Sequence, residues 1–309
     1  MDSHGEDALF SLPLDIALDA SGDLYVADSG NERIRRIAPD GTVTTLAGSE
    51  SGFVDGPATT ARFFAPTGLA LDGSGGLFVC EAGNHTIRRV DLTTGEVTTL
   101  AGGLPGYQDG PLADARFQQP NGLVVDRASN TLCVADTWNN AIRRVDLGTR
   151  RVETLAGGAV SGSRDGSGLE ARFFHPVRLA LDETGGMYVS DSENNRIRHV
   201  SASGDVTTVA GGSVGYEEGT GSAARFARPS GLALAQDGTL FLSDRLNHVI
   251  RSVTPDGTTS LVAGRPGVQG PSPDGDAGEV ALVAPFGLVM GADGQLFFTQ
   301  QHEVSAIER

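Results

Sequence analysis

The sequence repeats one unit six times, and this repetition restricts the chain to very few folds. One clear copy runs from Pro66 to Gly102, and a proline opens every copy. The opening prolines are Pro13, Pro66, Pro120, Pro176, Pro229 and Pro285. They lie 53, 54, 56, 53 and 56 residues apart. A fixed period of this size is typical of one supersecondary motif repeated around a ring or along a line.

Each copy contains four short apolar or β-branched runs separated by turn residues. In the second copy the runs are residues 69–71, 77–80, 86–90 and 97–100. Such runs predict antiparallel strands joined by tight turns, and no window has the 3.6-residue spacing of a helix. Four strands in about 50 residues form the blade of a β-propeller. We therefore predict an all-β, six-bladed propeller in which residues 1–309 form one domain. A parallel β-helix is disfavoured because its coils are shorter.

The second and third runs of each copy resemble the NHL repeat. The first copy reads Tyr25-Val-Ala-Asp-Ser-Gly-Asn-Glu-Arg-Ile-Arg, with counterparts at 78–88, 133–143, 188–198 and 241–251. Asn84-His85 and Asn247-His248 match the first two letters of the family name. The resemblance covers essentially the whole chain and implies a six-bladed propeller. It specifies function only loosely, because this family includes RNA binders, protein-interaction modules and a few enzymes.

An acidic residue ends the second run of five copies, and an asparagine follows it three residues later. The acidic residues are Asp28, Glu81, Asp136, Asp191 and Asp244, and the asparagines are Asn31, Asn84, Asn139, Asn194 and Asn247. A ring of carboxylates suggests metal binding, but the repetition favours a structural role. We expect each carboxylate to accept backbone N–H groups of its own turn, and each asparagine to adopt the left-handed conformation.

A second repeated pair lies in the loops between copies, in the pattern DG…ARF…P. The pairs, each seven residues apart, are Asp55–Arg62, Asp109–Arg116, Asp165–Arg172 and Glu218–Arg225. We expect each pair to close its loop through an ion pair. The phenylalanine after each arginine should be buried between neighbouring blades. In the sixth copy Asp274 is kept but Ala281 replaces the arginine, and in the first copy Leu9 replaces it.

Composition restricts the partners. The formal net charge is −16, with 23 basic against 39 acidic residues, whereas binding to nucleic acid requires clustered Lys and Arg. Nucleic acid is therefore not predicted as a partner, and a cationic ligand, a metal or a basic protein surface fits the charge better. No apolar run is long enough to span a membrane, so no membrane partner is predicted, and the compartment stays open. Cys80 and Cys133 are expected to be unpaired core residues.

The sixth copy is incomplete. It stops at residue 309, before any equivalent of Val97-Thr-Thr-Leu-Ala-Gly. Residues 1–12 resemble the end of an inter-blade loop, since Ala8-Leu9-Phe10 corresponds to Ala61-Arg62-Phe63. We predict a three-stranded sixth blade whose exposed edge either recruits another chain or marks a cut within a longer protein.

A binding site is expected where strand alternation gathers the varied loops, around one mouth of the central channel. Four copies begin P-x-G, but Asp15 replaces the glycine in blade one and Arg178 replaces it in blade four. These blades are opposite in a six-fold ring, so the two side chains should face each other across the mouth. A direct, buried pair would plug the channel and place function on the outer loops, whereas separated groups would anchor a ligand.

Further mouth residues complete the predicted site. The candidate ligand-binding residues are Asp15, Arg178, Asn121, Trp138, Thr67, Ser230, Phe286, His248 and Arg245. The candidate catalytic residues are His175, Arg178 and Asp15. His85, His248 and His302 occupy equivalent positions and suggest zinc, but a structural role that recurs with the repeat is the better interpretation. No metal and no cofactor are predicted.

The resemblance to family enzymes does not supply a metal site. Peptidyl-hydroxyglycine lyase, a six-bladed relative, holds zinc through histidines directly after the blade-opening prolines, and this sequence has no histidine there. We predict a binding or interaction module with a small-molecule or peptide site at the channel mouth. The alternative is a metal-independent enzyme of lyase, hydrolase or cyclase type. In it His175 would act as general base and Arg178 would clamp an anionic group.

Overall fold

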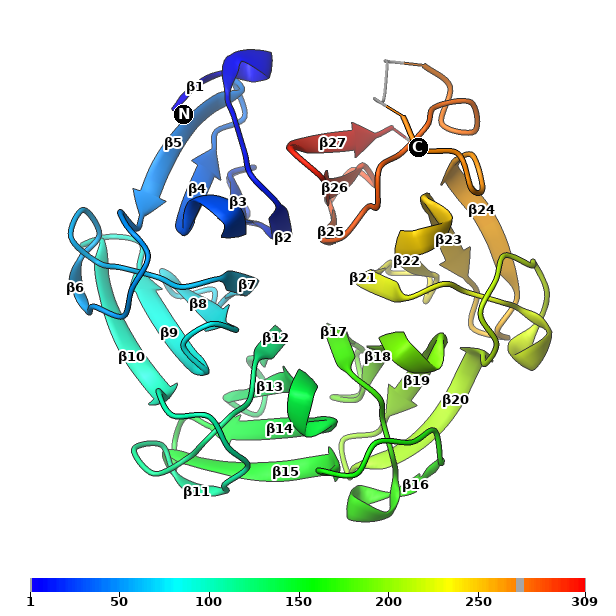
Figure 1. Cartoon of the computed structure of the whole chain (residues 1–309), viewed down its shortest axis with the longest axis horizontal. Coiled ribbons are helices and arrows are strands. Elements are labelled where there is room, and N and C mark those ends of the chain that lie inside the picture. The colour runs from blue at the N-terminus through cyan, green and yellow to red at the C-terminus, as the bar shows by residue number, and fades with distance from the viewer. Residues whose placement is uncertain (1, 271–274, 309) are drawn as a thin grey trace.

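Six sheets surround a central channel, one for each sequence repeat (Figure 1). The computed structural model describes residues 2–270 and 275–308. In the first five blades the innermost strand begins at the proline that opens the repeat, and in the sixth it begins three residues after Pro285. The predicted all-β, six-bladed propeller is confirmed.

The strands of each blade run outward from the channel in sequence order. Blade one contains β2 (Pro13–Leu18), β3 (Leu24–Asp28), β4 (Arg33–Ile37) and β5 (Thr42–Ala47). Blade two contains β7 (Pro66–Leu71), β8 (Gly76–Glu81), β9 (Thr86–Asp91) and β10 (Glu96–Gly102). Blade three contains β12 (Pro120–Asp126), β13 (Thr131–Asp136), β14 (Ala141–Asp146) and β15 (Arg151–Gly157).

The remaining blades follow the same order. Blade four contains β17 (Pro176–Leu181), β18 (Met187–Asp191), β19 (Arg196–Val200) and β20 (Asp205–Gly211). Blade five contains β21 (Pro229–Leu234), β22 (Leu240–Asp244), β23 (Val249–Val253) and β24 (Thr259–Gly264). Blade six has only β25 (Leu288–Met290), β26 (Leu296–Gln300) and β27 (Glu303–Ile307).

Short strands from the N-terminal segment and from three inter-blade loops add a fifth strand to the outer edge of blades one to four. They are β1 (Ser3–His4), β6 (Gly56–Pro57), β11 (Gly110–Pro111) and β16 (Gly166–Ser167). β1 pairs with β5 of blade one, with Ser3 opposite Val43. The prediction that residues 1–12 leave blade six incomplete is therefore confirmed. Within the described ranges, the structure has no helix with the length and apolar character that a membrane crossing requires.

The helical segments of the described chain are single 3-10 turns of three residues. Four of them join the second and third strands of a blade: η2 (Ser29–Asn31), η3 (Thr137–Asn139), η5 (Ser192–Asn194) and η7 (Arg245–Asn247). Three lie in the segments that precede the innermost strand of a blade: η1 (Gly5–Asp7), η4 (Gly168–Glu170) and η6 (Gly221–Ala223). Their brevity agrees with the absence of helical periodicity in the sequence.

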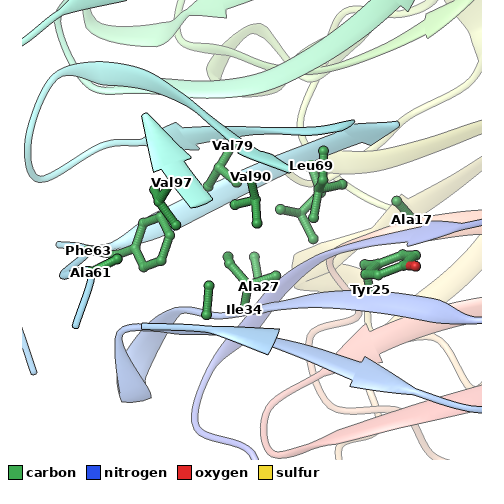
Figure 2. Packing of buried hydrophobic residues seen from close by; sticks show 12 residues of the cluster. Ala17, Tyr25, Ala27, Ile34, Ala61, Phe63, Leu69, Val79, Val90 and Val97 are labelled. Atoms are coloured by element: carbon green, nitrogen blue, oxygen red, sulfur yellow. The ribbon is translucent and has the colours of Figure 1, made fainter. Parts of the chain in front are cut away.

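The hydrophobic core lies between blades, because successive residues of a strand point to opposite faces of the sheet. Val79 of blade two contributes to the core with blade one, and Cys80 to the core with blade three. Figure 2 shows Phe63 and Val97 packed beside Ala61 at the outer end of the first of these clusters. Phe63, Phe117, Phe173 and Phe226 are fully buried, as predicted. Cys80 and Cys133 are both free and buried.

In each of the first five blades, a buried arginine on the third strand connects the blade to the loop that precedes it. In blade two the Arg88 guanidinium lies 2.6 Å from the Glu81 carboxylate and 2.5 Å from the Asp55 carboxylate. It also lies over the Phe63 ring, at 5.3 Å from the centroid. The corresponding arginines of the first five blades are Arg35, Arg88, Arg143, Arg198 and Arg251, all fully buried.

The predicted pairing within the inter-blade loop is wrong. Asp55 bonds Arg88, whereas Arg62 lies nearer the surface and pairs with Glu50 at 3.2 Å. The loop arginines Arg116, Arg172 and Arg225 likewise make no ion pair with Asp109, Asp165 and Glu218, which contact Arg143, Arg198 and Arg251 instead. The strand arginine is preferred because it is enclosed between two carboxylates, where the charge attraction is screened least. Asp274 lies outside the described residues.

The turn after the second strand also differs from the expectation. The carboxylate accepts a backbone N–H from the preceding inter-blade loop, as when Phe64 donates to Glu81 at 2.9 Å. Asn84 donates its side-chain amide to the same carboxylate, at 2.6 Å. The left-handed residue is the next one, His85, with φ of 58°. The asparagine therefore serves as a hydrogen-bond donor to the carboxylate.

Candidate functional site

One end of the propeller, which we call the mouth face, gathers three kinds of segment. These are the starts of the innermost strands, the turns between second and third strands, and the ends of the inter-blade loops. Hydrogen bonds hold these segments together. The residues before the opening prolines donate to the carboxylates that end the second strands: Ser11 N–H to Asp28, at 2.7 Å, and Gln118 N–H to Asp136, also at 2.7 Å. The channel mouth on this face is where the sequence places its candidate site.

Asp15 and Arg178 form a direct, buried ion pair. Arg178 Nε lies 3.3 Å from Asp15 Oδ1, and the two side chains are 5% and 10% exposed. Asp15 Oδ2 also accepts the Leu69 N–H at 2.9 Å. Burial raises the pKa of Asp15, and the nearby Arg178 charge opposes that rise. Of the two arrangements considered from the sequence, the structure has the direct one.

The terminal nitrogens of Arg178 donate to groups of several blades. One nitrogen donates to Asn121 Oδ1 at 2.9 Å and to the Val177 carbonyl at 3.3 Å. The other donates to the carbonyls of Leu14, at 2.7 Å, and Thr67, at 2.6 Å. The four terminal N–H groups are therefore matched by protein acceptors. Arg178 thus ties blades one to four together across the channel.

A cavity of about 320 Å³ lies on the far side of this ion pair. Asp15 and Arg178 line one end of it, and Leu18, Leu71 and Leu181 lie further along the innermost strands. The cavity is the part of the channel that leads away from the mouth face.

A second pocket of about 280 Å³ lies on the mouth face, where blades five, six and one meet. We call it the mouth pocket. It is lined by Leu12, Pro13, Leu14, Arg245, Leu246, His248, Gln269, Val283, Ala284, Phe286, Gln300 and Gln301. Three predicted ligand-binding residues, Arg245, His248 and Phe286, are brought together here. The walls are mostly apolar, and Arg245 supplies the formal positive charge.

Arg245 is half-buried, and no carboxylate of the described residues lies within 4 Å of its guanidinium. Its carbon Cζ is 4.9 Å from the centroid of the Phe286 ring. Burial lowers the pKa of Arg245, the neighbouring Arg228 charge lowers it further, and the Glu193 charge opposes this shift. A guanidinium in this setting gains from an anion, because it has lost water without gaining an ion-pair partner among the residues that the structure describes.

The predicted histidines have different surroundings. His248 Nδ1 accepts the Ala284 N–H at 3.0 Å, and His85 Nδ1 accepts the Gln119 N–H at 3.1 Å. Each of these histidines thereby links its own blade to the next one, because the donor is the residue just before the proline that opens the next blade. Asn140 and Asn195 make the same bond in blades three and four, to His175 and Arg228. The interaction belongs to the repeat, and burial lowers the pKa of both His85 and His248.

His175 lies in an aromatic cluster on the mouth face. Its ring stacks on Trp138, with centroids 5.3 Å apart, and lies 4.8 Å from the Phe174 ring. Burial lowers the pKa of His175. Trp138 remains 51% exposed and offers an open aromatic face.

Two further candidates, Ser230 and Thr67, bond backbone carbonyls of the next blade. Ser230 is buried, and its hydroxyl donates to the Pro285 carbonyl at 3.4 Å. Thr67 donates its hydroxyl to the Pro120 carbonyl at 3.1 Å. His302 is exposed in the turn of blade six. Across residues 2–270 and 275–308, no group of three His, Cys, Asp or Glu side chains is placed to hold a metal ion.

Sequence reasoning missed part of the mouth pocket. Gln269 contributes its side-chain amide 2.8 Å from His248 Nε2, and it lies in the loop before blade six, where the repeat pattern is weakest. Leu246 and Val283 also line the pocket. The signal available in the sequence was Arg245 and Phe286, which depart from the residues at the same repeat position in other blades.

Family comparisons match most of the chain. A family model for the teneurin NHL domain matches residues 48–254, and a model for the NHL repeat matches residues 10–37. Protein SUPPRESSOR OF QUENCHING 1, chloroplastic, from Arabidopsis thaliana is 29% identical over 296 residues, covering 88% of this chain and 28% of that protein. NHL repeat-containing protein 2 from Homo sapiens is 32% identical over 230 residues, and the match covers 63% of this chain and 32% of that protein. The chain thus spans about a third or less of these relatives.

Solved structures share the fold at low sequence identity. An auxiliary nutrient binding protein from Bacteroides thetaiotaomicron has a TM-score of 0.74 at 17% identity, covering 99% of this chain and 72% of that chain. Virginiamycin B lyase from Staphylococcus aureus has a TM-score of 0.59 at 14% identity, and the match covers 100% of this chain and 88% of that chain.

Proposed function

The chain belongs to the family of NHL-repeat β-propellers, and we propose that it is a binding module whose mouth pocket holds a small organic anion with an apolar body. The observation that carries this proposal is the pairing of Arg245 with a mostly apolar pocket of about 280 Å³. Apolar walls with a few placed polar groups are the usual composition of small-molecule sites. The carboxylate of such a ligand would meet Arg245, and its apolar part would lie against Phe286 and Leu14.

Local charge supports an anionic ligand even though the chain as a whole is acidic. The formal net charge is −16, so a free anion is repelled at long range, but salt screens that repulsion beyond about 10 Å. Among the described residues that line the pocket, Arg245 carries the formal positive charge. Gln269 and Gln301 add amide groups that can donate hydrogen bonds to a second ligand oxygen.

The fold is compatible with binding and with catalysis. Among proteins of similar fold, one is described as an auxiliary nutrient binding protein and another as virginiamycin B lyase. Binding is favoured here because the enzyme alternative relies on Arg178 to clamp an anion. The four terminal N–H groups of Arg178 already donate to Asn121, Val177, Leu14 and Thr67.

Calorimetric titration tests the proposal with two carboxylates, octanoate and 4-phenylbutyrate, and one neutral analogue, octanamide. We expect saturable one-to-one binding of a carboxylate and weaker binding of octanamide. Arg245→Gln should reduce carboxylate affinity by about 10- to 100-fold, the effect of losing one hydrogen bond to a charged group. Arg150→Gln, at an exposed turn of blade three, is the matched control and should bind as the unmodified protein does.

Two results would contradict the proposal. One is equal binding of octanoate and octanamide, which would mean that the guanidinium contributes nothing. The other is carboxylate binding that survives Arg245→Gln unchanged, which would place the ligand elsewhere on the propeller.

A further inference from the structure

The mouth face carries a set of exposed apolar side chains, which we call the crest. Each of the first five blades contributes one of them: Leu12, Phe64, Trp138, Phe174 and Leu246. Phe64 and Phe174 stand two residues before the opening proline of a blade, and Leu12 stands one before. Trp138 and Leu246 are the middle residues of η3 and η7. Exposed apolar side chains gathered at one end of a molecule mark a contact surface.

The crest residues lie at one level of the ring. In each of the first five blades, the middle residue of the turn after the second strand donates its N–H to the carbonyl two residues before the opening proline. Trp138 donates to Gln118 and Glu193 donates to Phe174, both at 3.1 Å. Equivalent positions of a ring of repeats have equal heights, so the crest defines a plane. Figure 1 views the ring along the channel, perpendicular to this plane.

Arginines without an ion pair surround the crest. Those that contact no carboxylate of the described residues within 4 Å include Arg33, Arg116, Arg172 and Arg196. Arg33 and Arg196 begin third strands at the mouth face. The Arg116 side chain lies against Gly106, whose carbonyl accepts the Asn139 side-chain amide of the mouth-face turn. In the described turns of this face, the carboxylates that pair with no arginine are Glu32 and Glu303.

The opposite end of the ring, which we call the far face, has the reverse character. An aspartate stands at the turn between the first and second strands of every blade, as at Asp72 and Asp182. Another stands at the turn between the third and fourth strands of the first five blades, as at Asp91 and Asp146. Among the described residues, no exposed large apolar side chain belongs to these turns. The two ends therefore differ in charge as well as in apolar exposure.

A flat, anionic surface matches the mouth face. A plane can touch side chains of five blades together, whereas a ligand in a cleft meets only neighbouring ones. Trp and Phe rings favour the boundary between water and lipid, and arginines beside them gain from anionic headgroups. We propose that the mouth face docks on an anionic lipid bilayer, with the crest at the level of the headgroups and the arginines on lipid phosphates.

The formal net charge of −16 is compatible with this orientation. The far-face aspartates lie at the other end of the strands, and a strand of five or six residues is about 17–20 Å long. Physiological salt screens charges separated by more than about 8 Å. The bilayer therefore interacts mainly with the arginines of the mouth face, while the aspartates keep the far face turned away from it.

Docking on a lipid surface differs from crossing a membrane. The sequence predicts no membrane partner because it has no apolar run long enough to span a bilayer, and surface contact needs no such run. The proposal is also independent of a ligand in the mouth pocket, because Phe64, Trp138 and Phe174 do not line that pocket.

Trp138 is the only tryptophan of the chain, so its fluorescence reports on the crest. The test mixes the unmodified protein with vesicles of phosphatidylcholine, either alone or with about 30% phosphatidylglycerol. We expect co-flotation with the anionic vesicles, a blue shift of the emission and quenching by lipids brominated on the upper acyl chain. Partitioning into phosphatidylcholine alone should be about tenfold weaker. Raising NaCl from about 0.1 M to about 0.5 M should weaken binding, because salt screens the arginine charges.

Two double variants test the apolar part of the crest. Phe64→Ser with Phe174→Ser should lower partitioning by about tenfold, because two exposed rings no longer leave water. Leu169→Ser with Leu261→Ser is the matched control, since both leucines are exposed in η4 and β24, away from the crest. The control should partition as the unmodified protein does. Melting temperatures by circular dichroism show whether each variant is folded.

A second pair of variants tests the charge. Arg116→Glu should weaken binding to anionic vesicles by about tenfold, because an attraction to the headgroups becomes a repulsion. Arg150→Glu makes the same change at an exposed turn of the far face. It should alter binding by less than about twofold, because that turn is screened from the bilayer.

Any of four results would overturn the proposal. The first is no partitioning of the unmodified protein into anionic vesicles, a result that depends on no variant. The second is partitioning without quenching of Trp138, which would place the lipid contact elsewhere. The third is an equal loss in the crest variant and its leucine control. The fourth is a dimer, seen by sedimentation without lipid, whose formation shifts the Trp138 emission and assigns the crest to a second copy of this chain.

Discussion

Arg178 of blade four reaches Asp15 of blade one, and the two buried side chains meet with Nε 3.3 Å from Oδ1. The two residues are 163 positions apart in the sequence. The guanidinium also bonds acceptors of blades one, two, three and four. A ring of separately packed blades is thereby connected through its centre, and the stability of the ring should depend on this pair.

Arg178→Met should lower the free energy of unfolding by about 3–5 kcal/mol, the usual effect of breaking a buried ion pair. The cause is that Asp15 stays buried without its counter-charge. Guanidinium denaturation measures the change. The double variant with Asp15→Leu should lose less than the sum of the single variants, because both charges are then removed together. Strictly additive losses would show that the two groups do not interact.

Arg88→Met should also be strongly destabilising, by about 3–5 kcal/mol, because it leaves the buried Glu81 unpaired. The neighbouring Arg89→Met is the matched control. Arg89 pairs with Asp72 at 2.8 Å, but it is partly exposed, so its loss should cost about 1 kcal/mol or less. Thermal or chemical unfolding of both variants provides the comparison. Similar losses would contradict the role assigned to the buried arginine.

Acidification should destabilise the protein through His85 and His248. Burial lowers the pKa of both histidines below 6.5, so the unfolded chain takes up protons first as the pH falls. Their contribution is complete above pH 6.5 and is lost as the pH falls through the lowered values. His85→Asn with His248→Asn should remove this part of the pH dependence, since Asn140 and Asn195 make the same bond.

The measurement for the histidines is the free energy of unfolding at several values between pH 5 and 7.5. The difference between the double variant and the unmodified protein should grow toward low pH. A constant difference would mean that neither histidine titrates differently on folding. Asp136 and Asp244, whose pKa values burial raises to about 6, titrate in both proteins and cancel in the difference.

Gly68→Ala should destabilise the ring by about 1–3 kcal/mol, the range for an overpacked core. An added Cβ at Gly68 would lie 2.2 Å from the backbone carbonyl oxygen of Asn121 in the next blade. Gly278→Ala is the control, because no atom of residues 2–270 or 275–308 lies within 4 Å of a Cβ added there. Denaturation curves of both variants decide the matter. An unchanged Gly68→Ala protein would show that the innermost strands can move apart freely.

The P-x-G pattern explains how much of the centre could be predicted. The glycines at 68, 122 and 231 are kept because each innermost strand lies against a carbonyl of the next blade. The two exceptions, Asp15 and Arg178, were visible in the sequence as departures from a repeated small residue. Their opposition across the channel followed from the six-fold count. Whether they would touch did not follow, because strand order does not give the width of a channel.

The ion pairs formed by the inter-blade loops were harder to predict from the sequence. Asp55 and Arg62 share one loop and suggest a local ion pair, yet Asp55 bonds Arg88 from another strand. Arg88 was visible in the sequence only as one letter of the repeated Ile-Arg-Arg run. Its partners come from residues 55, 63 and 81, which only the folded blade brings together.

The sequence alone determined the number of blades, the order of strands within each blade and the missing strand of blade six, because these follow from local alternation and turn residues that recur at a fixed period. The tertiary structure decided which charges pair and where a pocket forms. Those features depend on side chains that approach from different blades, and their distances are set by packing around the closed ring.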